Sequence, residues 1–174
     1  MSTSDRSLHL SDSFGISCGT VTLDPIRRKV LLIRWKKTGE FFLPKGRKNI
    51  GETLEDAALR ETYEETGFRV ALFPLPIPTL ATPATVEDTL DGSSVVTEPV
   101  AVSQRVRDGK LKIIFWFAAR GDATAMADAG TQEEWEDFES IWADYALAGP
   151  TLTFDDDRSI VRAVLDMVCE TSSG

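Results

Sequence analysis

The segment from Gly46 to Phe68, GRKNIGETLEDAALRETYEETGF, constrains the fold of this 174-residue chain more than any other stretch. Thr53 and Asp56 form an approximate capping box, and Gly67 suits the left-handed residue that follows a helix. These signals predict a helix of about thirteen residues, close to the mean for globular proteins. Its packing face carries small and apolar residues, Leu54, Ala57, Ala58 and Thr62.

Three carboxylates crowd the last turns of this predicted helix, at Glu61, Glu64 and Glu65. Residues three or four apart lie roughly 5–6 Å from one another at Cβ, so Glu61 faces both of the others. The repulsion costs about 0.2–0.5 kcal/mol per pair, and each negative charge near a helix C-terminus costs typically about 0.3–1 kcal/mol. We do not expect Arg60 alone to balance it. By itself, the pattern fits either a solvated acidic face or a site that attracts cations.

The same segment resembles the Nudix box, Gly-x5-Glu-x7-Arg-Glu-aliphatic-x-Glu-Glu-x-Gly-aliphatic. A chance match at all seven fixed positions has a probability of roughly one in ten million. Thr62 departs from the pattern, because the family usually has an aliphatic residue there. The resemblance implies an α/β fold, a Nudix-type α/β/α sandwich with a mixed central sheet, in a single domain. The matching residues are Gly46, Glu52, Arg60, Glu61, Glu64, Glu65 and Gly67.

The resemblance also implies a divalent-metal centre. Glu61 and Glu65 match principal ligands of Mg²⁺ or Mn²⁺, Glu64 binds directly or through water, and the backbone carbonyl of Lys45 contributes. Such hard cations prefer oxygen ligands. Family positions equivalent to Glu52 and Arg60 hold an arginine–carboxylate pair that orients the helix glutamates. The implied catalytic residues are Glu52, Arg60, Glu61 and Glu64.

The implied reaction is hydrolysis of a phosphoanhydride, in which a carboxylate accepts a proton from the attacking water. In some relatives this base is a glutamate of the box, and in others it comes from a distant loop. Two groups of candidates therefore remain open. They are Glu61 or Glu64 in the box, and Glu133, Glu134 or Glu136 further along the chain.

Charge is distributed unevenly along the sequence. The net charge of −9 argues against general binding to nucleic acid or to an anionic membrane. Residues 27–48 nevertheless contain nine basic residues and one acid, Glu40. This cluster indicates either a rim that binds a compact polyanion or a solvated strand edge protected by lysine. The candidate substrate-binding residues are Arg34, Lys36, Lys37, Lys45, Gly46, Arg47, Lys48 and Lys112.

Two kinds of polyphosphorylated substrate fit the flanking sequence. The segment WKKTGEFFLPKG resembles the corresponding stretch of diadenosine polyphosphate hydrolases, and the basic rim is similar to that of diphosphoinositol polyphosphate phosphohydrolases. The first strand, FGISCGTV, lacks the basic residues that the latter usually carry. Alternatives left open are an NDP-sugar, nucleotide or mRNA-cap hydrolase, and an inactive Nudix module that only binds. No RNA-binding motif favours the cap reading.

The remaining sequence outlines one domain. We expect a disordered segment over 1–12, a Nudix domain over 13–170 and a disordered tail over 171–174. Residues 45–52 and 73–92 are expected to be loops, and 133–142 fit either a short helix or a strand. A final helix is expected after Thr153, with a buried apolar stripe. Strands are predicted over 14–23, 30–35 and 41–43, and in a hairpin of 95–106 and 110–120 around the turn 107–109.

Location and redox state follow from what the sequence lacks. Residues 1–12 contain no apolar run of signal-peptide length, and no segment approaches about eighteen uninterrupted apolar residues. Cys18 and Cys169 lie far apart without neighbouring zinc ligands, so both are expected to be reduced. We expect a cytoplasmic protein with a nuclear location left open, no membrane or nucleic-acid partner, and an oligomeric state that the sequence does not give.

Overall fold

Two long strands form the centre of the computed structural model, which describes residues 7–82 and 95–171. β1 (Phe14–Asp24) and β7 (Lys110–Arg120) run in parallel and stay in register over ten residue pairs. Parallel strands inside a sandwich are covered on both faces, which accounts for the apolar sequences FGISCGTVTL and KLKIIFWFAA.

The other strands complete one mixed sheet of eight strands. β2 pairs with β1, and β8 continues the sheet beyond β2, while β6 and β5 pair with β7; all of these pairings are antiparallel. The strands are β2 (Lys29–Trp35), β3 (Phe41–Phe42), β4 (Lys45–Arg47), β5 (Ala71–Leu72), β6 (Ala101–Arg107) and β8 (Phe138–Asp144).

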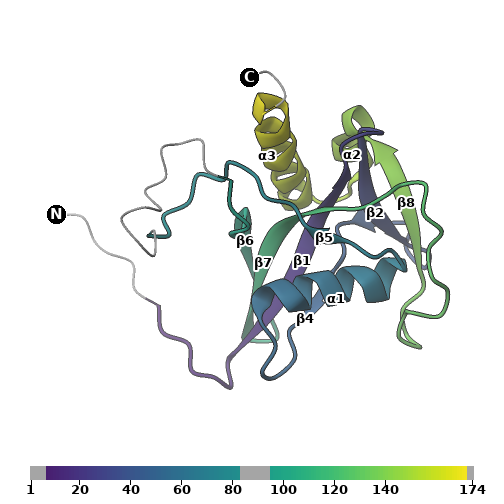
Figure 1. The fold of residues 1–174 in the computed structure, drawn as a ribbon. Coiled ribbons are helices and arrows are strands. Elements are labelled where there is room, and N and C mark those ends of the chain that lie inside the picture. Colours follow the sequence, from purple (N-terminus) through teal and green to yellow (C-terminus); the bar gives the residue numbers. More distant parts are fainter. Residues whose placement is uncertain (1–6, 83–94, 172–174) are drawn as a thin grey trace.

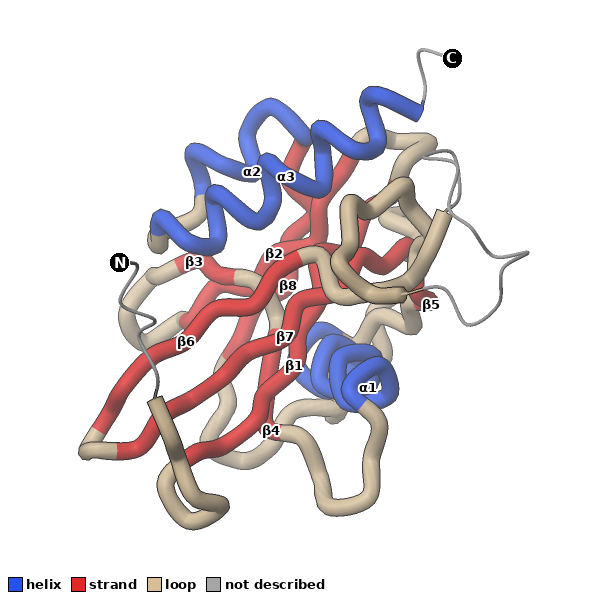
Figure 2. Tube along the Cα trace, turned by 90° about the vertical axis from the view of Figure 1, so that its left-hand side faces the viewer, coloured by secondary structure: helices blue, strands red, loops and turns tan. Residues whose placement is uncertain are grey.

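Helices cover both faces of this sheet. α1 (Leu54–Thr66) lies on one face, and α2 (Tyr145–Thr151) and α3 (Asp155–Thr171) lie on the other (Figures 1 and 2). The predicted single-domain α/β/α sandwich with a mixed sheet is therefore confirmed. The predicted domain boundaries stay predictions, because residues 1–6 and 172–174 are outside the described residues. None of the described helices combines the length and apolar character that a membrane-spanning helix needs.

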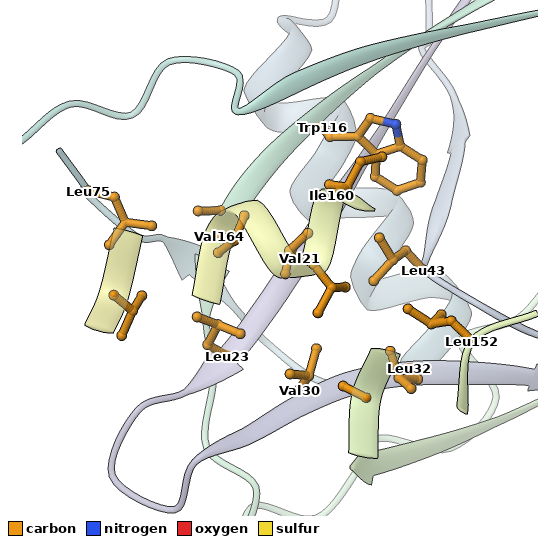
Figure 3. Close-up of a cluster of buried hydrophobic side chains, with 14 of the residues drawn as sticks. Val21, Leu23, Val30, Leu32, Leu43, Leu75, Trp116, Leu152, Ile160 and Val164 are labelled. Atoms are coloured by element: carbon orange, nitrogen blue, oxygen red, sulfur yellow. The ribbon is translucent and has the colours of Figure 1, made fainter. Parts of the chain in front are cut away.

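The larger part of the core lies between the sheet and α3. Val21, Leu23 and Leu32 of the sheet face Ile160 and Val164 of α3 (Figure 3). On the opposite face, the small side chains of α1 pack against Cys18 and Phe117. Cys18 is buried and Cys169 is exposed. The apolar stripe predicted for the last helix is confirmed, and its members are Ile160, Val161, Val164, Leu165 and Val168.

α1 has the ends that the sequence predicted. The Thr53 hydroxyl accepts a hydrogen bond from the Asp56 N–H, and Gly67 adopts a φ of 75°. Thr62, the departure from the box, is fully buried. Its hydroxyl lies 2.7 Å from that of Thr20 on β1 and donates to the backbone of its own helix. A hydrogen bond thus replaces the apolar contact of the family pattern.

Several expectations need correction. Residues 45–47, expected within a loop, form β4 and pair with β1. The first strand of the second hairpin begins at Ala101 and not near Val95, because Pro99 has no N–H to donate to a ladder. The ambiguous segment 133–142 contributes strand β8. Within the expected loop 73–92, Leu75 forms a bridge with Val96, and residues 83–92 are outside the described residues.

Candidate active site

A cavity of about 690 Å³ opens beside the second half of α1. Strands β2, β4, β6 and β7, the region around Phe42 and the segment before β8 contribute its other walls. Its charged and aromatic residues come from positions far apart in the sequence. They are Glu61, Glu64, Glu65, Glu133 and Glu136; Lys45, Arg47, Arg60, Arg107 and Lys112; and Trp35, Phe42, Trp135 and Phe138.

Glu61, Glu64 and Glu65 form the acidic wall of this cavity, and Arg60 is hydrogen-bonded to the first two. Its guanidinium donates two hydrogen bonds to Glu52, at 2.7 and 3.0 Å, so the arginine–carboxylate pair expected from the box is present. These bonds hold the pKa of Glu52 below its ordinary value. Nη1 also donates to Glu61 and to Glu64, at 2.8 Å each. Arg60 therefore balances more of the helix charge than the sequence led us to expect.

Glu65 is the most deeply buried of the three carboxylates, with 4% of its surface exposed. It accepts a hydrogen bond of 2.8 Å from the backbone N–H of Lys45. Burial nevertheless raises its pKa to about 8 and also raises the pKa of Glu61. Pairing of β4 with β1 places Gly46 directly against Glu61, where any Cβ atom would overlap the carboxylate. Gly46 thus leaves the space that the Glu61 carboxylate occupies, and a larger residue would displace that carboxylate.

The donor set fits a hard divalent cation in its chemistry. Three carboxylates from two adjacent helical turns face one cavity, and two of them are buried. As the side chains stand, no three acidic, histidine or cysteine groups in the described ranges surround a common ion position. Instead, Nη1 of Arg60 bonds Glu61 and Glu64. If a cation were held between these glutamates, contacts from Glu61 and Glu64 to the cation would replace their contacts with Arg60.

Lys112 faces the acidic wall. It is partly buried on β7, and burial, with Lys45 and Arg105 nearby, lowers its pKa to about 8. The Lys112 side chain makes no hydrogen bond or ion pair within the part of the chain that the structure describes. Burying a cation among other cations is unfavourable without a counter-charge, so this position favours a bound anion.

The candidate substrate-binding residues separate into two sets. Lys45, Gly46, Arg47 and Lys112 line the cavity. The others are not among its lining residues: Arg34 pairs with Glu139, Lys36 pairs with Asp137 at 2.8 Å, Lys37 is exposed, and the Lys48 side chain donates to the backbone of Asn49. The basic residues of 27–48 therefore do not form one rim. Because β2 pairs with β8, Arg34 and Lys36 lie next to acidic residues on and just before β8.

The segment before β8 is fixed to the end of α1. The Thr131 hydroxyl donates to the carbonyl of Glu64, and the Gln132 side chain donates to that of Glu65. These bonds satisfy carbonyl groups that a helix end leaves free. They bring Glu133 and Glu136 to the cavity, while Glu134 is not among its lining residues. Burial raises the pKa of Glu136, helped by the charges of Glu133 and Glu64.

The sequence did not lead us to two features of this cavity, Arg107 and an aromatic wall. The aromatic wall consists of Trp35, Phe42, Trp135 and Phe138. Trp35 and Phe42 make edge contacts with Phe138, at ring-centroid distances of 6.5 and 5.7 Å. Trp135 remains two-thirds exposed at the cavity. Arg107 looked like part of a turn and lies at the end of β6. The available signal was the presence of aromatic residues within two charged segments, three in WKKTGEFF and two in EEWEDF.

Comparison with known proteins agrees with this geometry. A model of the NUDIX domain matches residues 14–164. The fold is shared with a NUDIX hydrolase from Nitrosomonas europaea, at 14% identity and a TM-score of 0.58, over 87% of this chain and 88% of the other. An Ap4A hydrolase from C. elegans in a binary complex aligns at 17% identity and a TM-score of 0.62, over 90% and 98%.

A third solved structure, a NUDIX-family hydrolase from Clostridium perfringens, aligns at 20% identity and a TM-score of 0.59, over 91% of this chain and 99% of that protein. At such identities, the structural similarities establish the fold alone. The family is established by the domain match, which spans most of the chain. Five of the seven box residues, Gly46, Arg60, Glu61, Glu64 and Glu65, line one cavity. The chain therefore belongs to the Nudix family of pyrophosphohydrolases.

Proposed function

We propose that the protein hydrolyses a phosphoanhydride in a dinucleoside polyphosphate such as a diadenosine polyphosphate. The observation that carries this proposal is Lys112, a partly buried cation without an ion pair in the described residues, in a cavity that Glu61, Glu64 and Glu65 also line. Lys45 and Arg107 add positive charge beside it. A chain of several phosphates would meet these cations on one side and the acidic wall on the other.

The acidic wall supplies the residues for a metal-dependent reaction. Glu61, Glu64 and Glu65 would hold Mg²⁺ or Mn²⁺, together with the backbone carbonyl of Lys45. A bound divalent ion neutralises phosphate charge and makes a water more acidic. Glu52 fixes Arg60 through two hydrogen bonds, and Arg60 in turn orients Glu61 and Glu64.

Glu136 is the base that these surroundings favour. Glu61 and Glu64 each already bind Nη1 of Arg60 through one carboxylate oxygen, at 2.8 Å. Glu136 has no arginine partner among the described residues, and its pKa is raised by burial. A carboxylate with a raised pKa accepts a proton more readily near neutral pH.

The aromatic wall favours a nucleoside over an inositol ring at one end of the substrate. Trp135, exposed at the cavity, offers a flat surface on which a base can stack. The structural similarity to an Ap4A hydrolase supports the same choice. Diphosphoinositol polyphosphate remains the second candidate, because the cluster of Lys45, Lys112 and Arg107 would bind any dense phosphate group.

The first test measures phosphate and nucleotide release with Mg²⁺ or Mn²⁺. The substrates are diadenosine tetraphosphate, a diphosphoinositol polyphosphate, ADP-ribose and capped RNA, and Glu65→Gln serves as the blank. We expect kcat/KM for diadenosine tetraphosphate to exceed the other values by about tenfold or more. Preference for ADP-ribose or capped RNA would overturn the substrate, and inactivity on all four would favour a module that only binds.

A second test addresses the base. We expect Glu136→Gln to lower kcat by about 10²–10⁴-fold and to remove the acidic limb of the pH–rate profile, because the amide cannot accept the proton. Glu134→Gln removes an equal charge from the same segment, outside the cavity lining, and should retain wild-type kinetics. A normal pH profile in Glu136→Gln would return the role to Glu61 or Glu64.

A further inference from the structure

A second compartment of about 360 Å³ adjoins the cavity. The two share five lining residues, including Phe42, Lys45 and Lys112, so those residues form their common boundary. Its other lining residues are Glu40, Arg105, Phe154 and Asp157. Its volume lies within the range for small-molecule sites, roughly 300–1,000 Å³.

Asp157 gives this compartment its chemical character. The residue lies in the first turn of α3 and is only 1% exposed. Its Oδ2 accepts a hydrogen bond of 3.2 Å from the Leu43 N–H, whereas its Oδ1 is buried without a hydrogen-bond partner among the described residues. A buried carboxylate oxygen without a hydrogen bond costs free energy, so a ligand that donates a hydrogen bond to Oδ1 would be stabilised there.

The nearby cations do not satisfy this oxygen. Arg105 is held at 2.9 Å by Asp156, and its guanidinium stands 5.9 Å from the centroid of the Phe154 ring. Lys45 and Arg105 lower the pKa of Asp157, but burial outweighs them and raises it to about 6. Asp157 is therefore mainly ionised at neutral pH and accepts hydrogen bonds without donating any.

These features select one class of group. A carboxylate repels phosphate, so the compartment differs from the cationic boundary beside it. Phe42 and Phe154 provide aromatic surface, and Asp157 calls for a hydroxyl or amino donor. A nucleoside combines a flat ring with both kinds of donor, whereas a terminal phosphate has neither.

We propose that the second compartment binds the far nucleoside of a dinucleoside polyphosphate, with Asp157 accepting a hydrogen bond from a hydroxyl or amino group of that nucleoside. The phosphate chain then crosses the boundary formed by Lys45 and Lys112, and the other nucleoside lies on the aromatic wall near Trp135. This inference rests on the proposed function and adds a reason for preferring a substrate with two nucleosides.

The test compares diadenosine tetraphosphate with adenosine 5′-tetraphosphate, which has the same phosphate chain and lacks one nucleoside. The wild type should prefer the dinucleoside, chiefly through a lower KM. Asp157→Asn keeps an oxygen for the Leu43 N–H and places an NH₂ group where Oδ1 now lies. We expect the ratio of the two kcat/KM values to fall roughly tenfold, as for loss of one charged hydrogen bond.

Two further variants sharpen the comparison. Asp155→Asn removes the same charge from the same helical turn, but its side chain is 94% exposed, pairs with Arg158 and is not among the lining residues; it should keep the wild-type ratio. Phe154→Ala removes a ring that is 36% exposed and should also lower the ratio. It serves as the decisive variant if Asp157→Asn does not fold.

The outcomes separate this inference from the proposed function. Equal kcat/KM for the two tetraphosphates in the wild type, or an unchanged ratio in the folded Asp157 or Phe154 variant, overturns the second compartment and leaves the substrate class standing. Turnover of neither tetraphosphate, with cleavage of ADP-ribose or capped RNA, overturns the proposed function and this inference together.

Discussion

Glu65 carries a carboxylate in surroundings that disfavour its charge. The side chain is buried, and Glu61 and Glu136 add negative charge to the effect of burial on its pKa. The Lys45 N–H only partly compensates. A proton and a divalent cation would compete for the same carboxylate, so its strain in the metal-free protein is consistent with a role in holding metal.

This strain predicts a pH dependence of stability in the metal-free protein. The pKa of Glu65 is about 8 in the folded state against an ordinary value of 4.5. Between these values the unfolded chain releases the proton and the folded chain retains it, so stability falls as pH rises through this window. We expect unfolding by urea, with a chelator present, to show a smaller decline with pH for Glu65→Gln than for the wild type.

The comparison is made between variants because Glu61, Glu136 and Asp157 also have raised pKa values. Glu134→Gln, at an exposed position, should follow the wild type at every pH. Parallel curves for the wild type and Glu65→Gln from pH 5.5 to 8.5 would contradict the buried, strained carboxylate. Adding Mg²⁺ at pH 8.5 should restore stability to the wild type and not to Glu65→Gln.

At the scale of elements, the site depends on how α1 is held between two segments. Its second half lies against β4, whose Lys45 N–H bonds Glu65. Its C-terminus is capped by Gly67 and by donors from Thr131, Gln132 and Ser140. The first contact fixes the carboxylates against the sheet, and the second brings Glu136 toward them.

The same elements show what a sequence can reveal. α1 was predictable because its signals are local: Thr53 begins it, Gly67 ends it and small residues repeat at helical spacing. β4 was not, because its three residues have no strand pattern and become a strand only by pairing with β1. β8 stayed ambiguous because the spacing of its aromatic residues fits both a helix and a strand. Its pairing with β2 makes it a strand.

The carboxylates of the candidate site were likewise predictable and its cationic and aromatic parts were not. Glu61, Glu64 and Glu65 share one helix, so their spacing alone places them together. Arg107 and Asp157 lie far from them in sequence, and only the order of strands brings both beside Lys45. Basic residues that are close together in the sequence can also lie on different parts of the surface, because successive strand residues point to opposite faces.

At the scale of the whole molecule, an acidic protein places several cations around one cavity. The net charge is −9, yet Lys45, Arg47, Arg107 and Lys112 all line the cavity. Lys36, by contrast, is paired with Asp137 at the surface. Because the field of the remaining surface repels a polyanion, binding must depend on cations that meet the substrate inside the cavity.

This arrangement predicts different effects for two lysines that carry the same charge. At pH 7, Lys112→Met should raise KM for diadenosine tetraphosphate about tenfold and flatten the dependence of KM on ionic strength, because one cation fewer attracts the phosphates. Lys36→Met removes an equal charge whose partner is Asp137, so its KM and salt dependence should stay close to the wild type. Steady-state kinetics from roughly 0.02 to 0.3 M salt measure both. Equal effects of the two substitutions would mean that overall surface charge, and not the cavity, attracts the substrate.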